Sequence, residues 1–559
     1  MFDRGPATPL PRPAPDAAPG PLDDRLYDLV EERFVRLIRD NPVLATAVGL
    51  HADDDLLGDG SREQVLAELD ADRIHLAAIE AIDPSSLSPM ARFERDLEIH
   101  NVRRAVFDAD VLRLWERRSF ALDTIGDGLF LLFARDHAPL AERLDAIAGR
   151  LEAAATYLEE AKSRATVPQV RPWQRIELET AADLPSFFDE LVAAGQPDLP
   201  AAEQRRLERA SESAKIAVEL YAGWLETTLE GGTDEWAIGR ERHDAMVGLR
   251  AFDGLDADAI LELGWARLAE EHEGRAAAAR EIDPEADEMT VIARVKSDQP
   301  ASFDEALGAY REAMFRSRRH IIERGLMTVP DDERIDVIAT PGYLRNVVPF
   351  AAYFEPATFD PDPKGIYIVT PAVHDNPNAM REHNYASISN TSIHEAYPGH
   401  HLQLDAARRN GSLTRMLADA PEFTEGWGMY SELLMREHGF DDAAQFRLVM
   451  HTDAIWRACR IILDVRMHRG ELSMEEATDF LVEHTRFERA NAAAEVQWYT
   501  YRPTYPLSYL LGRTLLLALR ADEQRRLGDG FSLKAFHDTL LRNGSLPISF
   551  HRRLLANGT

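Results

Sequence analysis

A stretch of eight residues, HEAYPGHH from His394 to His401, contains two candidate metal ligands and a candidate general base. In an ordinary H-E-x-x-H motif, two histidines four residues apart lie on one helix face and reach one Zn²⁺, and the glutamate activates a water on the metal. Here the residue four positions after His394 is Pro398. The stretch therefore predicts a metal-binding helix that is interrupted.

The Pro-Gly pair at the interruption can restore a shared metal. Proline removes a helical N–H and clashes with the preceding turn, and glycine allows a bulge that turns the following residues back. On an uninterrupted helix, His401 would lie on the correct face but roughly 10 Å along the axis, and His400 would point away. A shared metal thus requires a bulge, and the sequence leaves open whether His400 or His401 is the second ligand. The alternative is an ordinary surface or capping turn.

A second candidate helix follows Pro421 and reads EFTEGWGMYSE over residues 422–432. In zinc sites with two histidines and a glutamate, the glutamate comes from a downstream helix and a water fills the open position. Glu425 fits that role. Glu432, two turns later on the same face, is the alternative.

The segments HEAYPGHHLQ, EGWGMYSELL and YPLSYLLG resemble the DUF885 family of bacterial proteins, which is grouped with the gluzincin-like metallopeptidases. The resemblance runs from about Asp24 onward and includes an H-E-x-x-P-G-H-H signature. It implies a mainly α, multi-helix gluzincin-like bundle that holds one Zn²⁺ per chain. The last segment departs from the commoner P-G-Q-A-L-x-Y pattern, since residues 503–509 read PTYPLSY. This chain lacks the Gly-Gln pair of that pattern, and we expect its absence to affect substrate specificity more than metal binding.

Composition bounds the class of partner. The chain has 559 residues and a net charge of −33, so nucleic acid and anionic membrane surfaces would repel it. Its single cysteine, Cys459, excludes an intrachain disulfide and is expected to be a buried small side chain. We also expect no membrane span and a cytoplasmic location, because residues 1–22 lack the apolar region of a secretory signal.

The chain divides into three predicted regions: a disordered leader (1–22), an N-terminal helical region (23–330) and a catalytic region (331–559). We expect the last two to form one continuous fold with a central cleft. Three short apolar runs, Ile335–Pro341, Phe350–Phe354 and Gly365–Pro371, are typical of strands. They predict a small antiparallel sheet beside the metal helix. The sheet either offers an edge for an extended substrate or only packs under the helix.

Further site candidates lie near the C-terminus. On one predicted helix, His468 shares a face with Asp464; either this is a solvated ion pair, or His468 donates to a substrate carbonyl with Asp464 orienting it. Tyr509 is a candidate oxyanion donor, although aromatic residues at such spacing are often core. Arg502, Tyr505 and Arg513 are candidate substrate-binding residues, since a guanidinium can hold a substrate carboxylate.

These parts predict a zinc-dependent hydrolase, a metallopeptidase that cleaves short peptides through a zinc-activated water. His394, His400 or His401, and Glu425 would hold the metal, and Glu395 would act as general base. Two alternatives remain: an amidase or esterase acting on a non-peptide metabolite, and a non-catalytic helical binding protein. The sequence does not define the substrate, exo- or endo-cleavage, or the oligomeric state.

Overall fold

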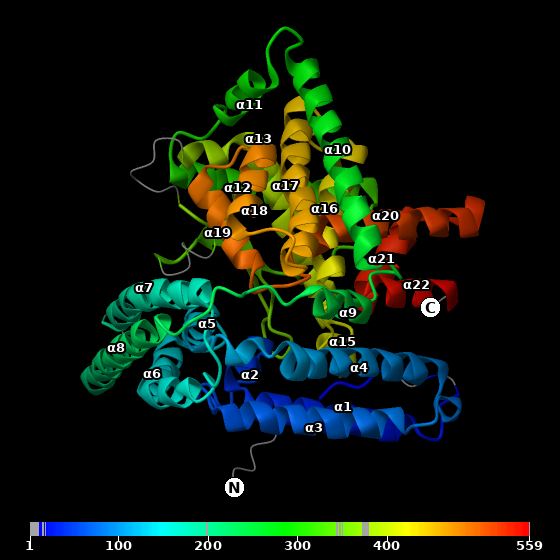
Figure 1. Ribbon diagram of the computed structural model, residues 1–559. Helices are drawn as coiled ribbons and strands as arrows, with labels where there is room; N and C mark the ends of the chain where they lie inside the picture. Colours follow the sequence, from blue (N-terminus) through cyan, green and yellow to red (C-terminus); the bar gives the residue numbers. More distant parts are fainter. Residues whose placement is uncertain are drawn as a thin grey trace. The chain divides into compact units, whose positions relative to one another are not determined.

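The structure, a computed structural model, describes residues 10–13, 16, 18–196, 199–342, 345, 348, 350–371 and 379–557. It is mainly helical with one three-stranded sheet, so the predicted fold class is confirmed at that level (Figure 1). No helix among the described residues is both long enough and apolar enough to span a membrane.

The chain forms two compact units, which are described separately. Unit 1 comprises Met1–Trp236, Ala357–Pro363 and Gly411–Leu417, and unit 2 comprises Ala237–Pro356, Lys364–Asn410 and Ala418–Thr559. The units therefore divide first after Trp236, whereas the regions predicted from composition meet after residue 330. The two short segments of unit 1 from the second half of the chain, Ala357–Pro363 and Gly411–Leu417, were not predicted to belong with the N-terminal helices.

Unit 1 is built from helices whose apolar stripes meet in shared cores. Leu26 and Phe34 of α1 are buried with Ile79 of α3 and Leu413 of α15, as the amphipathic pattern of these segments requires. Ser61 and Ser88 cap α3 and α4 by accepting hydrogen bonds from backbone N–H groups of the first turn. The helices are α1 (Asp23–Asp40), α2 (Pro42–Val48), α3 (Arg62–Glu80), α4 (Pro89–Phe107), α5 (Ala121–Ala134), α6 (Leu140–Lys162), α7 (Arg171–Gly195), α8 (Ala201–Leu229) and α15 (Leu413–Met416), with the short turns η1 (Pro84–Ser86), η2 (Asp108–Leu112) and η3 (Leu114–Glu116).

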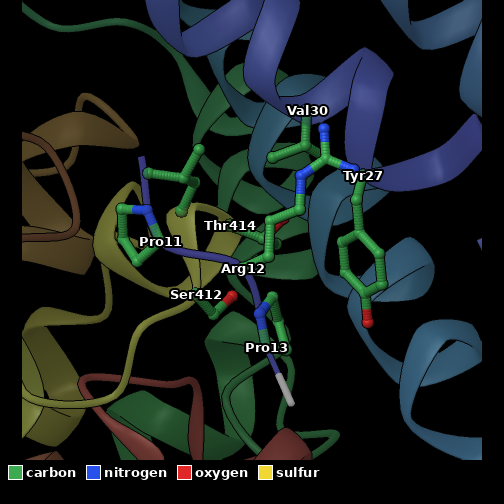
Figure 2. A pocket seen from close by; sticks show the side chains of 8 residues that line it. Pro11, Arg12, Pro13, Tyr27, Val30, Ser412 and Thr414 are labelled. Carbon is green, nitrogen blue, oxygen red and sulfur yellow. The ribbon is translucent and has the colours of Figure 1, made fainter. Parts of the chain in front are cut away.

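Residues 10–13, within the predicted disordered leader, lie against α1 and the 412–414 segment. The Arg12 guanidinium pairs with Asp28 and Glu31, each at 2.7 Å. Pro11 and Pro13 flank Arg12 in a small pocket (Figure 2). This part of the leader is therefore placed on unit 1, while residues 1–9, 14, 15 and 17 lie outside the described residues.

Unit 2 is a helical bundle around α17. Helix α10 runs along α17, and α16 packs on α20 (Figure 1). Cys459 on α17 is buried, as predicted. The helices are α9 (Arg240–Arg250), α10 (Ala257–Ile282), α11 (Glu288–Lys296), α12 (Phe303–Arg324), α13 (Tyr385–Glu395), α14 (His400–Arg408), α16 (Pro421–Glu437), α17 (Ala444–His468), α18 (Met474–Thr485), α19 (Arg489–Tyr499), α20 (Ser508–Leu527), α21 (Leu533–Asn543) and α22 (Ile548–Asn557), with the short turns η5 (Ala379–His383) and η6 (Gly528–Gly530).

The sheet of unit 2 contains the three predicted strands, β1 (Ile335–Ala339), β2 (Ala351–Phe354) and β3 (Gly365–Val369). Their order is β1-β3-β2; β3 pairs antiparallel with β2 and parallel with β1. The prediction of an antiparallel sheet is therefore wrong for the β1–β3 pair. All five residues of β3 are buried, which explains its unbroken apolar run GIYIV. Strand β2 contacts α13, so the sheet lies beside the predicted metal helix.

Candidate metal centre

The predicted metal helix is broken into two. Helix α13 ends at Glu395 and α14 begins at His400, so the chain makes a full break instead of a bulge. The return is tight: the Gly399 N–H donates to the Ile393 carbonyl at 3.0 Å, and a Cβ on Gly399 would lie 1.8 Å from the His394 carbonyl oxygen. Only glycine fits there, and the break brings the His400 ring to 4.7 Å from the His394 ring.

Two imidazoles and one carboxylate converge at this break. His394 Nε2 lies 3.7 Å from Glu425 Oε2, and His400 Nε2 lies 3.4 Å from the same oxygen. The ligand atoms of all three residues lie within 4.8 Å of one another, and all three side chains are buried. The structure thus brings His394, His400 and Glu425 together. Of the two histidines that the sequence left open as the second ligand, His400 is the one in this cluster.

His401 belongs to a different cluster. Its Nε2 lies 2.8 Å from Glu333 Oε2, and its Nδ1 lies 2.8 Å from the Tyr353 hydroxyl. Tyr397 also donates to Glu333. Because both nitrogens of the buried His401 ring are engaged away from His394, the structure does not bring His401 to the candidate metal ligands.

Glu432, the alternative ligand, lies behind His394 instead. Its Oε1 is 2.8 Å from His394 Nδ1, and its Oε2 accepts a hydrogen bond from Asn390 at 3.0 Å. A carboxylate on the far nitrogen fixes the orientation of a metal-binding imidazole. Asn390, one helical turn before His394 on α13, was not among the predicted residues, although its spacing places it on the same face.

Glycines on α16 and α20 make room for this arrangement. A Cβ on Gly428 would lie 2.6 Å from His394 Cε1, so a side chain there would displace the imidazole. A Cβ on Gly512 would lie 1.9 Å from the Glu422 carbonyl oxygen, so α16 and α20 approach closely only because this position is glycine. The EGWG segment therefore serves the packing around Glu425 as well as supplying that residue.

Two tyrosines lie near Glu425: Tyr505 just before α20, and Tyr509 in the first turn of that helix. The Tyr505 hydroxyl donates to Glu425 Oε1 at 2.7 Å, which leaves Oε2 toward the histidines. The Tyr509 ring lies 6.1 Å from the Tyr505 ring and is covered by the Arg460 guanidinium at 4.6 Å. Within the described part of the chain, the hydroxyl of the half-buried Tyr509 makes no hydrogen bond. Tyr505 is thus engaged, and the Tyr509 hydroxyl is available.

The electrostatics of the centre favour a cation. Burial alone would lower the pKa of His394, but its close contacts with the Glu425 and Glu432 carboxylates outweigh burial and raise that pKa to about 10. Burial alone would raise the pKa of Glu425, yet its contacts with His394 and His400 hold it well below its usual range. Two buried carboxylates around two imidazoles therefore favour positive charge between them.

Glu395 differs from its neighbours in being half-buried. Among the described residues, its carboxylate makes no hydrogen bond or ion pair. It directly follows His394 at the end of α13. An accessible and unpaired carboxylate beside the two histidines has the properties required of a group that handles the proton of a water.

Comparison with known families and solved structures shows the family of the chain and two proteins with a similar fold. A family model described as a bacterial protein of unknown function (DUF885) matches residues 42–555. The chain belongs to the DUF885 family. Its fold is similar to that of "a putative lipoprotein of unknown function from Shewanella oneidensis", with 20% sequence identity and a TM-score of 0.76 over 95% of this chain and 99% of that chain. It is also similar to "the putative lipoprotein from Colwellia psychrerythraea", with 18% identity and a TM-score of 0.82 over 96% and 99% of the two chains. No curated protein matches the sequence significantly.

The two solved structures correct one prediction. Both are described as a "putative lipoprotein", and this description contradicts the prediction of a cytoplasmic location. That prediction rested on the lack of an apolar region in residues 1–22.

Three other predicted residues of the DUF885 chain make no contact with the candidate metal ligands among the interactions of the described residues. His468 has no exposed surface, its Nε2 lies 3.0 Å from the Tyr499 carbonyl oxygen, and burial lowers its pKa to about 4. Arg513 is buried in an ion pair with Glu271, so it is not free to bind a substrate carboxylate. Arg502 is exposed. The polar stripe of α17 thus lies inside the bundle, where Asp464 and His468 are fully buried.

Proposed function

We propose that this DUF885 protein is a zinc-dependent hydrolase of the gluzincin-like metallopeptidase clan that cleaves short peptides. The observation that carries the proposal is the convergence of His394, His400 and Glu425 on one point, with Glu432 behind one imidazole. Two imidazoles and a carboxylate with room for a fourth ligand suit Zn²⁺ better than Mg²⁺ or Ca²⁺, which prefer oxygen ligands.

The residues fit that ion for two further reasons. Glu432 holds His394 Nδ1, so the tautomer that leaves Nε2 free toward Glu425 is favoured. Tyr505 holds the outer oxygen of Glu425. The net negative charge of the two carboxylates also balances a divalent cation when both imidazoles are neutral.

The remaining groups divide the work of hydrolysis. A bound zinc ion would supply a Lewis acid that polarises a carbonyl group and makes a water more acidic. Glu395 accepts the proton of the attacking water and returns it to the leaving amine. Tyr509 donates its phenolic hydrogen to the oxygen that becomes negative. Burial and the negative charge of Glu425 raise the pKa of Tyr509, so its hydroxyl stays protonated at neutral pH.

Metal content tests the proposal first. After equilibration with Zn²⁺ and removal of free metal, His394→Ala and Glu425→Ala are each expected to hold about one ion fewer per chain than the parent, because a site with three protein ligands does not retain the metal on two. Elemental analysis measures this. Equal zinc in the parent and both variants would contradict the ligand assignment.

Tyr509→Phe is expected to lower kcat by roughly 10², because one oxyanion donor contributes about 3 kcal/mol in comparable sites. KM, zinc content and the thermal midpoint should change little. The rate on a peptide identified by digestion of a mixed library measures the effect. Tyr505→Phe is the matched comparison, and it should instead weaken zinc affinity, since it removes the hydrogen bond to Glu425. A lower thermal midpoint with unchanged kcat in Tyr509→Phe would make Tyr509 a core aromatic.

A further inference from the structure

Unit 1 contains a second group of imidazoles and carboxylates. Asp54 Oδ2 lies 2.8 Å from His51 Nδ1 and 3.4 Å from His137 Nε2. The ligand atoms of these three residues lie within 4.8 Å of one another. His51 and Asp54 come from the connection between α2 and α3, and His137 comes from the connection between α5 and α6. The cluster therefore joins two separate loops of unit 1.

The outer contacts of this cluster repeat those of the centre in unit 2. Asp360 Oδ1 lies 2.7 Å from His51 Nε2, as Glu432 lies behind His394. The Thr46 hydroxyl donates to Asp54 Oδ1 at 2.6 Å, in the way that Tyr505 donates to the outer oxygen of Glu425. In each cluster, a carboxylate oxygen lies near one nitrogen of each of two rings, and hydrogen bonds hold the far side of the carboxylate and of one of the rings. The rings are perpendicular in unit 2 and parallel in unit 1, so the His137 ring has to turn when both rings bind one ion.

The two rings of the cluster can supply a lone pair. The imidazoles of His51 and His137 stack at 3.7 Å with an angle of 3° between their planes, and two positive charges in that arrangement would repel. The His137 side chain is only 5% exposed, and its Nδ1 is buried without a hydrogen-bond partner within the described residues. At least one ring is therefore neutral, and a neutral imidazole binds a metal.

We infer that His51, Asp54 and His137 form a second divalent-metal site, one that takes zinc. Two imidazoles and a carboxylate form the same donor set as in unit 2, and such a set selects Zn²⁺ among the common divalent ions. Through Asp360, which contacts His51, the site also fixes the 357–363 segment within unit 1. The ion thereby links three stretches of unit 1 that are far apart in the sequence.

A proton competes with the metal at this cluster. Burial alone would lower the pKa of His51, but hydrogen bonds with Asp360 and Asp54 outweigh burial and raise it to about 9. Arg150 adds positive charge nearby, since its guanidinium contacts the Thr46 hydroxyl at 2.5 Å. Without metal, a protonated His51 would therefore bridge the two aspartates, and zinc would have to displace that proton.

Zinc stoichiometry tests the site in a protein that lacks the first centre. The double variant His394→Ala/Glu425→Ala, equilibrated with Zn²⁺ at neutral pH and freed of excess metal, is expected to retain about one ion per chain, and adding His137→Ala should remove it. In the otherwise unchanged protein, His137→Ala should lower the zinc content from two ions to one. His75→Ala is the matched control, because His75 is a buried histidine of unit 1 that lies 2.9 Å from one carboxylate, Glu98.

Cobalt provides a second readout that does not depend on activity. Co²⁺ added to His394→Ala/Glu425→Ala should give the visible absorption of a nitrogen- and oxygen-bound ion, and His137→Gln, which preserves side-chain volume better than alanine, should abolish it. A double variant that folds and binds neither Zn²⁺ nor Co²⁺ overturns the inference. In that case the cluster is held by hydrogen bonds alone, with His51 bridging Asp54 and Asp360.

The result is independent of the proposed hydrolase function. If the double variant His394→Ala/Glu425→Ala holds no zinc, the inference of a second site fails. If His394→Ala holds as much zinc as the parent, the ligand assignment of the first site fails. The two failures are therefore distinguishable.

Discussion

His400→Ala is expected to lose the zinc ion of the centre formed with His394 and Glu425, and to lose hydrolysis with it. The His400 ring lies 4.7 Å from the His394 ring, and its Nε2 shares Glu425 Oε2 at 3.4 Å. Removing one of three ligands should weaken binding by more than the roughly 10–100-fold that the loss of an outer hydrogen-bond partner causes. Zinc content after dialysis and the rate on a cleaved peptide measure the two effects.

The neighbouring residue is the matched control for this variant. His401 contacts Glu333 and Tyr353 instead of the metal ligands, so His401→Gln should keep the zinc and the activity. Its thermal midpoint should fall, because Glu333 and Tyr353 lose a buried hydrogen-bond partner at a cost of about 1–3 kcal/mol. The opposite pattern, with zinc lost from His401→Gln and kept in His400→Ala, would exchange the roles of the two histidines.

Glu395→Gln is expected to lower kcat by roughly 10³, within the 10²–10⁴ range of general acid–base groups, while zinc content and fold stay unchanged. The carboxamide has the same shape but cannot accept the proton of the attacking water. Because Glu395 makes no hydrogen bond or ion pair with the described residues, no structural contact is lost in the exchange. Rates at saturating peptide, with zinc analysis of the same sample, measure the effect.

Glu382→Gln is a suitable control, since Glu382 is exposed and pairs with Lys296 at 2.8 Å. It should leave kcat unchanged. A Glu395→Gln protein that turns over at the parental rate would remove Glu395 from the mechanism. If the zinc-loaded parent cleaves no peptide of a mixed library, the peptidase proposal fails, and amide or ester substrates and a binding role become the hypotheses to test.

Several features of the fold and the site were predictable because they depend on residues close together in the chain. Helices follow from apolar residues at helical spacing, and all three strands follow from short apolar runs bounded by proline, glycine and aspartate. The break after Glu395 follows from Pro398 and Gly399. Glu425 was identified as a ligand candidate by its place at the start of a downstream helix. Membership of the DUF885 family also follows from the sequence, through the family model that matches residues 42–555.

Other features depended on which surfaces pack together, and local pattern carries no information about that. The choice of His400 over His401 depends on the direction in which α14 leaves the break, and the role of Glu432 depends on the approach of α13 to α16. The parallel pairing of β1 with β3 is similar, because alternation and apolar runs identify a strand but not its neighbour.

The second cluster is the clearest case. His51, His137 and Asp360 are far apart in the sequence and lie in connections with no periodic pattern, so no spacing rule joins them. Sequence by itself determined the helical class, the strands, the interruption of the candidate metal helix and most of the ligand candidates, because these are properties of neighbouring residues. Only the tertiary structure decided which histidine faces Glu425, which carboxylate stands behind His394, and that a second His-Asp cluster exists, because these arise from the packing of distant segments.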